Sequence, residues 1–351
     1  MALNSQPQEW IFYIKTTETC NLNCDHCFTS GKHGRKIYFN PDNTAEWTNK
    51  LKDLYPERSA HFEFHGGEPF LAPVTDMWRF YNATKDHWEN PSYGCTTNLV
   101  HKLTDEKLEF MDTVLEKRIG TSWDPKIRFD NEKQRQLWED NVRFLIDRGY
   151  QVKLFVSLTR DCIDMEPIDL LKYVKSLGIQ EMALERVTKN GHAAKNLEIF
   201  PSNIELQKWF VKFHHQSEEH GAREWFANEF FESIYAKFER DSTNEGTFCR
   251  NCEQNLFTIN ADGTIAGCPN AAPEDHYATL DMHPKDVINS NGRCTVIVKE
   301  LQRDPRCFSC SVYKYCNGDC HQLEWEGDYC AAPRYLMKYL NGENIDDLWV
   351  R

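Results

Sequence analysis

The sequence predicts an α/β protein in which parallel strands alternate with helices, followed by a smaller region rich in cysteine. Through the first two thirds of the 351 residues, short apolar runs alternate with amphipathic segments of helical length. This alternation favours a parallel sheet with helical crossover connections. The chain also carries 14 cysteines, three of them between positions 20 and 27 and nine from position 249 onward. With no secretory signal in the sequence, such cysteines indicate metal ligands rather than disulfides.

Composition excludes several classes of protein. The 41 Lys and Arg against 54 Asp and Glu give a formal net charge of −13, which argues against a nucleic-acid-binding surface. Charged residues make up 27% and hydrophobic residues 40% of the chain, as in ordinary globular proteins. No signal peptide is evident, and no apolar run approaches the roughly 20 residues of a membrane helix. We therefore expect a cytoplasmic protein without membrane or nucleic-acid partners.

Six strand-helix units can be assigned in order. The expected strands cover residues 9–17, 60–65, 93–98, 118–124, 151–159 and 181–187. The expected helices cover about 41–55, 70–88, 103–116, 131–148, 165–177 and 202–218, the first capped by Asn40 or Asp42. The aromatic-rich stretch from about 199 to 240 is expected to be helical and to serve packing. In parallel barrels, chemistry gathers at the carboxyl ends of the strands.

The first motif is the CxxxCxxC sequence of Cys20, Cys24 and Cys27, directly after the first strand. Three neighbouring thiolates can hold three irons of a 4Fe-4S cluster and leave the fourth iron without a protein ligand. The alternative is a zinc knuckle, for which His26 in the loop or His33 just beyond it would have to supply a fourth ligand.

The other motifs of this region fall at later strand ends. Gly66 and Gly67 allow a close backbone approach, and the carboxylate of Glu68 can accept from an ammonium group. Alone, the Gly-Gly-Glu-Pro sequence is more often a turn. Asn98 and Ser122 also lie at expected strand ends, where capping of the strand is the alternative to binding.

A second set of cysteines follows near the carboxyl end. It comprises Cys249, Cys252, Cys268, Cys307, Cys310, Cys316, Cys320 and Cys330. Eight thiolates complete two sites of four, with two structural zinc sites as the alternative to iron-sulfur clusters. Residues 260–264 predict a hairpin turn that brings Cys252 and Cys268 together. The remaining Cys95, Cys162 and Cys294 are expected to be buried hydrophobic residues.

Taken together, these motifs resemble the radical S-adenosylmethionine (SAM) enzymes that carry a C-terminal SPASM extension with two auxiliary clusters. The resemblance covers roughly residues 9–335 and implies an open, partial (β/α)6 TIM-like barrel followed by a small cysteine-rich SPASM domain. The implied domains are the barrel at 1–218, a helical bridge at 219–248, the SPASM domain at 249–335 and a tail at 336–351.

The same resemblance implies three 4Fe-4S clusters and bound SAM. Cys20, Cys24 and Cys27 would hold the SAM-binding cluster. The implied inner auxiliary ligands are Cys249, Cys252, Cys268 and Cys320, and the outer ones are Cys307, Cys310, Cys316 and Cys330. The implied SAM contacts are His26, Gly66, Gly67, Glu68, Asn98 and Ser122. Two positions depart from the family pattern: Leu99 replaces a glycine, and Trp123-Asp124-Pro125 replaces Leu-Asp-Gly, so Trp123 either lines the pocket or packs in the core.

For function, the resemblance implies reductive cleavage of SAM to a 5′-deoxyadenosyl radical, with flavodoxin or ferredoxin as the reductant. We expect an oxidoreductase that crosslinks or desaturates a peptide or protein. Asp124 and Glu185 are candidate general bases, with salt bridging as the alternative for each. Pro269 stands where the sulfatase-maturing branch carries an Asp, which disfavours that reaction. The short stretch before the first strand leaves no room for a leader-binding domain, so a leader would need another surface or protein.

Two further functions stay open from sequence alone. One is a radical SAM dehydrogenase or modifying enzyme that acts on a small molecule. The other is a non-catalytic binding module in which metal only stabilises the fold. A neighbouring gene for a short peptide would favour the peptide-modifying function.

Overall fold

The computed structural model describes residues 9–239, 252–271 and 275–350. The chain forms two compact units, each assembled from three separate stretches. Unit 1 comprises Met1–Gly120, Asn190–His192 and Asn251–Val298, and unit 2 comprises Thr121–Lys189, Ala193–Arg250 and Lys299–Arg351. The expected domain boundaries near 218 and 248 stay a prediction, and the second lies outside the described residues.

Unit 1 contains a six-stranded sheet with the order β10-β9-β8-β1-β2-β3. Its strands are β1 (Trp10–Thr17), β2 (Ala60–Gly66), β3 (Ser92–Cys95), β8 (Leu256–Ile259), β9 (Thr264–Ala266) and β10 (Ala278–Thr279). The predicted hairpin at 260–264 is confirmed, because β8 and β9 pair antiparallel across it. The sequence did not predict that β8 also pairs parallel with β1, with Ile11 opposite Leu256.

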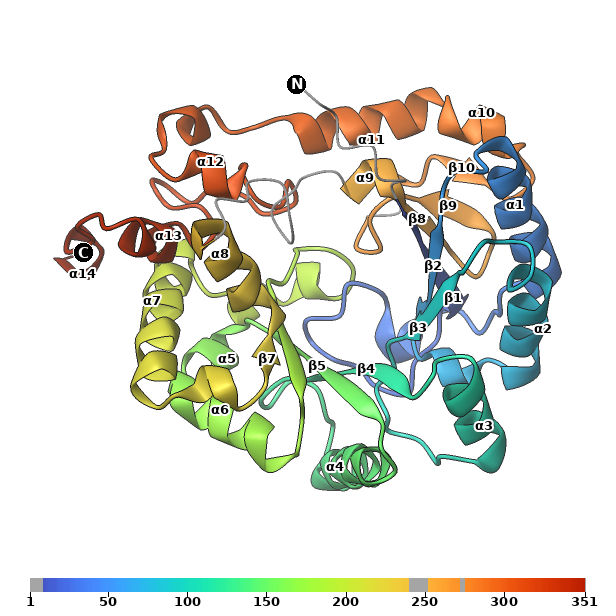
Figure 1. Ribbon diagram of the computed structural model, residues 1–351, viewed down its shortest axis with the longest axis horizontal. Helices are drawn as coiled ribbons and strands as arrows, with labels where there is room; N and C mark the ends of the chain where they lie inside the picture. Colours follow the sequence, from blue (N-terminus) through green and yellow to red (C-terminus); the bar gives the residue numbers. More distant parts are fainter. Residues whose placement is uncertain (1–8, 240–251, 272–274, 351) are drawn as a thin grey trace. The chain divides into compact units, whose positions relative to one another are not determined.

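Helices α1 (Pro41–Leu54), α2 (Val74–Thr84) and α3 (Asp105–Thr113) lie beside strands β1 to β3 (Figure 1). Helix α1 begins as predicted, since the Asn40 side chain accepts hydrogen bonds from the first backbone N–H groups. Three rings on adjacent strands stack in the core: the ring centroid of Phe12 lies 5.1 Å from that of Phe62 and 5.5 Å from that of Phe257. This stacking fixes β8 against the amino-terminal strands.

Shorter elements complete unit 1. They are η1 (Gly31–His33), η2 (Pro69–Leu71), α9 (Cys252–Asn255), α10 (Pro284–Ile288) and most of α11 (Asn291–Leu301).

Unit 2 is built around a four-stranded sheet with the order β4-β5-β6-β7. Its strands are β4 (Arg118–Trp123), β5 (Gln151–Ser157), β6 (Glu181–Glu185) and β7 (Ala227–Asn228). Its longer helices are α4 (Glu132–Asp147), α6 (Pro167–Ser176), α7 (Asn203–Glu219), α8 (Glu229–Glu239) and α13 (Arg334–Leu340). Its short helices are α5 (Arg160–Ile163), α12 (Tyr313–Cys316), α14 (Asp347–Val350), η3 (Ala193–Lys195), η4 (Leu197–Ile199), η5 (Ala222–Glu224) and η8 (Pro305–Ser309).

The aromatic residues from 199 to 239 pack in the core of unit 2, as predicted. Phe213 on α7 stacks on Phe231 on α8, with ring centroids 4.4 Å apart. Trp123 is also a packing residue, since its ring lies 4.6 Å from that of Tyr173 on α6 and its side chain is buried. Of the two alternatives for Trp123, the structure shows packing in the core.

Two details of the sequence analysis need correction. Cys95 and Cys162 are buried as expected, but Cys294 is exposed on the outer face of α11, so that expectation was wrong. The strand predicted to run to residue 98 ends at Cys95, and the chain then adopts a left-handed φ of 53° at Leu99. Among the described residues, no helix has both the length and the apolar character needed to cross a bilayer.

Candidate functional site

The loop that carries Cys20, Cys24 and Cys27 is joined directly to the Gly-Gly-Glu segment at the end of β2. The Gly67 N–H donates to Thr17 O at 2.9 Å, and the Glu68 N–H donates to Thr19 O at 3.0 Å. A Cβ atom on Gly67 would lie only 2.0 Å from Thr19 O. Glycine is therefore required at position 67 for the segment to approach the residue before Cys20.

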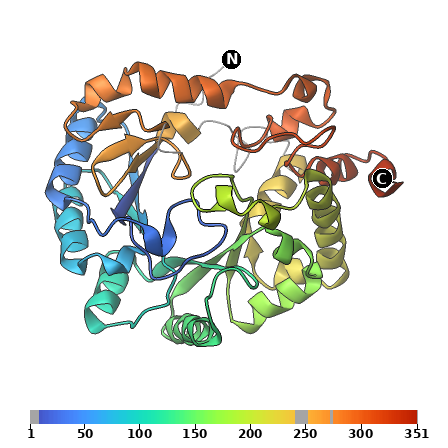
Figure 2. The ribbon, with the colours of Figure 1, turned by 180° about the vertical axis from the view of Figure 1, so that it is seen from behind.

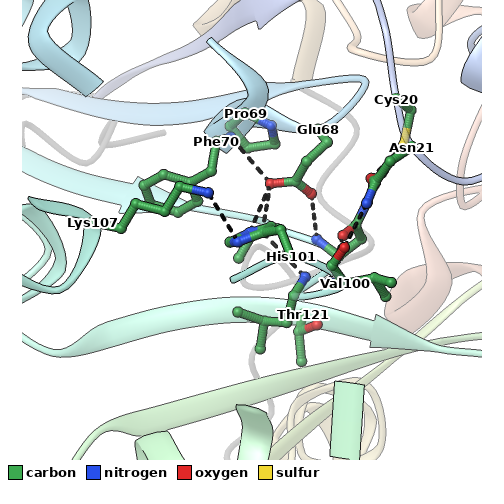
Figure 3. Close-up of polar contacts among 12 residues, drawn as sticks. Cys20, Asn21, Glu68, Pro69, Phe70, Val100, His101, Lys107 and Thr121 are labelled. Atoms are coloured by element: carbon green, nitrogen blue, oxygen red, sulfur yellow. Dashed lines mark hydrogen bonds and ion pairs between the residues drawn. The ribbon is translucent and has the colours of Figure 1, made fainter. Parts of the chain in front are cut away.

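Glu68 is fully buried and organises the end of β3 (Figure 3). Its Oε1 accepts from Phe70 N at 3.1 Å and from Thr97 Oγ1 at 2.7 Å, and its Oε2 accepts from Asn98 N at 2.7 Å. Burial alone would raise the pKa of Glu68, but hydrogen bonding and charge from His101, with these donors, lower it below its usual value. The carboxylate is thus ionised and satisfied by protein groups.

Asn98 connects this network to the first cysteine. Its Nδ2 lies 3.5 Å from Cys20 Sγ and donates to Asn21 Oδ1 at 2.7 Å. Asn21 Nδ2 donates to Val100 O at 2.6 Å, and Val100 N donates back to Asn98 Oδ1 at 2.8 Å. These mutual bonds require the turn at Leu99, and they fix the end of β3 against the cysteine loop.

His101 and Lys107 belong to the same network and were missed by the sequence analysis. His101 Nε2 lies 3.4 Å from Glu68 Oε1, and Lys107 Nζ lies 3.1 Å from His101 Nδ1 (Figure 3). Lys107 also lies over the Phe70 ring, 5.6 Å from its centroid. A histidine three residues after Asn98 was the one available signal.

A short segment after β6 returns to the cysteine loop within unit 1. The two segments lie side by side in Figure 2. The His192 N–H donates to Thr29 O at 3.0 Å, and His192 Nδ1 donates to Cys24 O at 3.1 Å. A Cβ on Gly191 would lie 2.3 Å from the carbonyl group of Phe28. Residues 190–192 thus brace the loop of the three cysteines.

The thiols of this loop suit a metal cluster. Burial, then the nearby Glu68 carboxylate, raises the pKa of Cys20 to about 11, although the Leu22 N–H donates to its sulfur at 3.4 Å. A thiol in this setting becomes a thiolate when a metal cation replaces its proton. In the described part of the chain, no three His, Cys, Asp or Glu side chains converge on one point, as the ligands of a single metal ion would. In a 4Fe-4S site each thiolate binds a different iron, so that convergence is not required.

Cys252 and Cys268 lie on adjacent segments of unit 1. Glu253, which follows Cys252 in α9, is buried, and its Oε2 accepts from the Cys268 N–H at 3.2 Å. A Cβ on Gly267 would lie 1.6 Å from the same carboxylate oxygen. The hairpin therefore brings Cys252 and Cys268 onto neighbouring segments, as predicted. Cys249 lies outside the described residues.

Lys15 is buried in β1 near both cysteine sets of unit 1. Burial lowers its pKa to about 8, while the interactions with Cys268, Glu18 and Cys27 act in the opposite direction. It places a cationic side chain beside two predicted ligands.

Five of the C-terminal cysteines line one cavity of about 460 Å³ in unit 2. They are Cys307, Cys310, Cys316, Cys320 and Cys330. Burial raises the pKa of Cys316 to about 11 and that of Cys330 to about 12, so these thiols also need a cation to ionise at neutral pH. Cys320 was assigned to the inner set, and the division of ligands between the two sets stays a prediction.

The two candidate bases have different surroundings. Asp124 is buried: Arg128 Nε donates to its Oδ2 at 2.6 Å and Ser157 N donates to its Oδ1 at 2.7 Å, which is the salt-bridged arrangement. Glu185 is exposed at the end of β6, yet desolvation by the surrounding protein raises its pKa despite the opposing charge of Arg186. Of the other predicted SAM contacts, Ser122 on β4 is half-buried and His26 in the cysteine loop is buried.

Solved structures with the same fold exist. The chain matches "Native anSMEcpe with bound AdoMet and Cp18Cys peptide" with a TM-score of 0.77 and 15% sequence identity, over 98% of each chain. It matches "Crystal structure of Streptococcus suis SuiB bound to precursor peptide SuiA" with a TM-score of 0.62 and 14% identity, over 90% of this chain and 72% of that one. SuiB bound to S-adenosylmethionine gives 0.62 and 13%, over 90% and 73%.

No family model matches the sequence, and no curated protein matches it either. The likeness is therefore one of fold at low sequence identity. It confirms the predicted partial barrel followed by a cysteine-rich region.

Proposed function

We propose that this chain, which has the radical SAM fold with a SPASM extension, uses SAM and three 4Fe-4S clusters to modify a peptide oxidatively. The observation that carries the proposal is the hydrogen bond from the Glu68 N–H to Thr19 O. It joins the CxxxCxxC loop to the Gly-Gly-Glu segment, two motifs that are weak alone but form one binding site when adjacent.

In this proposal Cys20, Cys24 and Cys27 hold the SAM-binding cluster. SAM bound at the open iron would be reductively cleaved and supply a 5′-deoxyadenosyl radical that removes a hydrogen atom from the substrate. The second constellation would hold two auxiliary clusters, with the cysteine-lined cavity of unit 2 as one site, and the inner one would accept the second electron that the loss of two hydrogens requires.

The chain's own residues position SAM. The backbone of Gly66 and Gly67 would face the methionyl amino group of SAM. A side chain at either position would clash with the neighbouring backbone, so both residues must be glycine. Asn98, Ser122 and His26 are the further proposed contacts. Because protein donors occupy both oxygens of Glu68, we assign Glu68 the task of holding Asn98 and Thr97 in place.

Glu185 is the better-supported general base. A base must be able to receive a proton, and Asp124 is already held by Arg128 and Ser157 N. Glu185 is exposed and its pKa is raised, so it holds a proton more readily than an ordinary carboxylate.

The peptide substrate is supported by the structural neighbours, because anSMEcpe is described with a Cp18Cys peptide and SuiB with its precursor peptide SuiA. A flavodoxin or ferredoxin as reductant and a cytoplasmic location complete the proposal.

The cofactor part of the proposal is tested by anaerobic reconstitution. We expect about twelve irons per chain, and replacement of Cys20, Cys24 and Cys27 together by Ala should remove about four of them and abolish 5′-deoxyadenosine formation. A wild-type protein with about four irons and zinc in the second constellation would contradict the auxiliary clusters.

The substrate part is tested by mass spectrometry of a peptide encoded next to this gene, co-expressed with the enzyme. A loss of two hydrogens that disappears in Cys24→Ala supports oxidative peptide modification. An unchanged peptide beside an oxidised small metabolite would instead identify a small-molecule enzyme.

A further inference from the structure

Arg186, the residue after β6, makes a buried ion pair inside the cysteine-rich part of unit 2. Its Nη2 donates to Asp319 Oδ1 at 2.9 Å and its Nη1 contacts Asp319 Oδ2, so the pair is bidentate. Only 7% of the Arg186 side chain and 5% of the Asp319 side chain are exposed. A paired arginine this deep is held in one orientation, because its planar donors match a carboxylate at two points.

Asp319 lies in the loop between two predicted ligands, Cys316 and Cys320. This loop has an unusual backbone, since Asn317, Gly318 and Asp319 have φ values of 52°, 81° and 54°. Two of these three residues are not glycine, so the surrounding structure must hold the loop in this left-handed conformation. In this conformation the Gly318 N–H donates a hydrogen bond to Cys316.

Arg186 also reaches the segment of the last cysteine. Its Nη1 donates to Ala331 O at 3.2 Å, next to Cys330, and its guanidinium lies over the Phe230 ring, 5.5 Å from the centroid. Gln207 on α7 fixes the same segment independently, because its Nε2 donates to Cys330 O at 2.7 Å. One guanidinium thus connects the loop of Cys316 and Cys320 with the segment that carries Cys330.

The charge of Arg186 acts on the same cysteines. Its guanidinium lies near enough to Cys320, Cys316 and Cys330 to interact with charge on their sulfurs. Arginine keeps its proton in proteins, so a positive charge faces these sulfurs. Asp319 places the compensating negative charge in the ligand loop itself.

We infer that Arg186 and Asp319 are positioning residues of the auxiliary cluster in the unit 2 cavity: the pair ties together the ligand-bearing segments, and its two charges set the cluster's reduction potential. The inference rests on the proposed function, since it requires that these thiolates hold a 4Fe-4S cluster. Each reduction adds one electron to the site, which the Arg186 charge favours and the Asp319 charge opposes.

The test uses the full chain, reconstituted anaerobically in a background in which Cys20, Cys24 and Cys27 are Ala, so that only auxiliary clusters are titrated. Arg186→Gln should lower the midpoint potential and Asp319→Asn should raise it, each by at least a tenfold change in the reduction equilibrium, which is 59 mV for one electron. A residue that only stabilised the fold would not move the potential in opposite directions. Equal potentials in both variants and the parent would overturn the charge role.

Either single variant leaves a buried charge without its partner and can fail to fold. The double variant Arg186→Gln/Asp319→Asn removes both charges and leaves a neutral amide pair. In it we expect a potential close to that of the parent but iron release to a chelator at least tenfold faster, because the bidentate tether is gone. Arg135→Gln, at a surface ion pair of α4, is the matched control and should change neither quantity. Iron release at the parental rate in the double variant would overturn the tether.

Failure of this inference differs from failure of the proposed function. If the wild-type thiolates of the cavity bind no iron, the inference is wrong, while 5′-deoxyadenosine formation still reports SAM cleavage at the Cys20 site. If the variants behave as expected but the wild type forms no 5′-deoxyadenosine, the proposed function is wrong and the inference stands.

Discussion

Glu68→Ala should loosen the end of β3 and the cysteine loop rather than merely remove one ligand contact. The carboxylate is fully buried and accepts hydrogen bonds from Phe70 N, Thr97 Oγ1 and Asn98 N, with His101 beside it. Removing the carboxylate leaves three buried donors without an acceptor, at about 1 to 3 kcal/mol each and so at least about 3 kcal/mol in all. At about 1.4 kcal/mol per tenfold, local opening becomes at least a hundredfold more frequent.

The assay is hydrogen–deuterium exchange by mass spectrometry on peptides that contain Asn98 and Cys20. Glu116→Ala is the control, since Glu116 forms only an exposed ion pair with Arg118. The folded-state pKa of Glu68 is lowered, so its stabilisation is present above the ordinary carboxyl pKa and is lost as pH falls through the lowered one. The difference between wild type and variant should therefore be full at neutral pH and shrink in acid. Unchanged exchange at Asn98 and neutral pH would refute the assignment of Glu68 as the organiser of this end of the sheet.

Two further changes test other parts of the site. Gly191→Ala should remove iron from the Cys20 site, because a Cβ there meets the Phe28 carbonyl group. Gly221→Ala is the control: Gly221 has a similar φ of 60° but open space around it, so this variant should retain all its iron. Equal iron in both variants would contradict the role of residues 190–192 in holding the cysteine loop. Glu185→Gln should abolish the modified peptide, because a neutral amide cannot take up the proton that a general base receives. Product formation at the wild-type rate by Glu185→Gln would exclude Glu185 as the base.

The sequence predicted the order of strands and helices because that information is local. The apolar runs from Trp10 to Thr17 and from Ala60 to Gly66 appear in the structure within a residue or two of their expected ends. The adjacency of the CxxxCxxC loop and the Gly-Gly-Glu segment also followed from the parallel arrangement, since both lie at carboxyl ends of neighbouring strands.

Contacts between distant segments could not be predicted in this way. Nothing near Arg186 or Asp319 in the sequence indicates that they pair across 133 positions. The left-handed turn at Leu99 could not be predicted from the leucine itself, because a buried leucine in that conformation is held by tertiary contacts against its own preference. His101 was overlooked since histidine in a loop has no distinctive pattern until Glu68 is placed beside it.

The pairing of β1 with β8 has a consequence for synthesis of the chain on the ribosome. Ile11 lies opposite Leu256, so one edge of β1 stays unpaired until 245 further residues have been added to the chain. At about 5 to 20 residues per second, this interval is roughly 12 to 50 s. During that time an apolar strand presents unpaired N–H and C=O groups, a surface to which other chains can add. We therefore expect nascent chains to be prone to association at this edge, and the cysteine loop follows a strand that lacks one neighbour until β8 has been made.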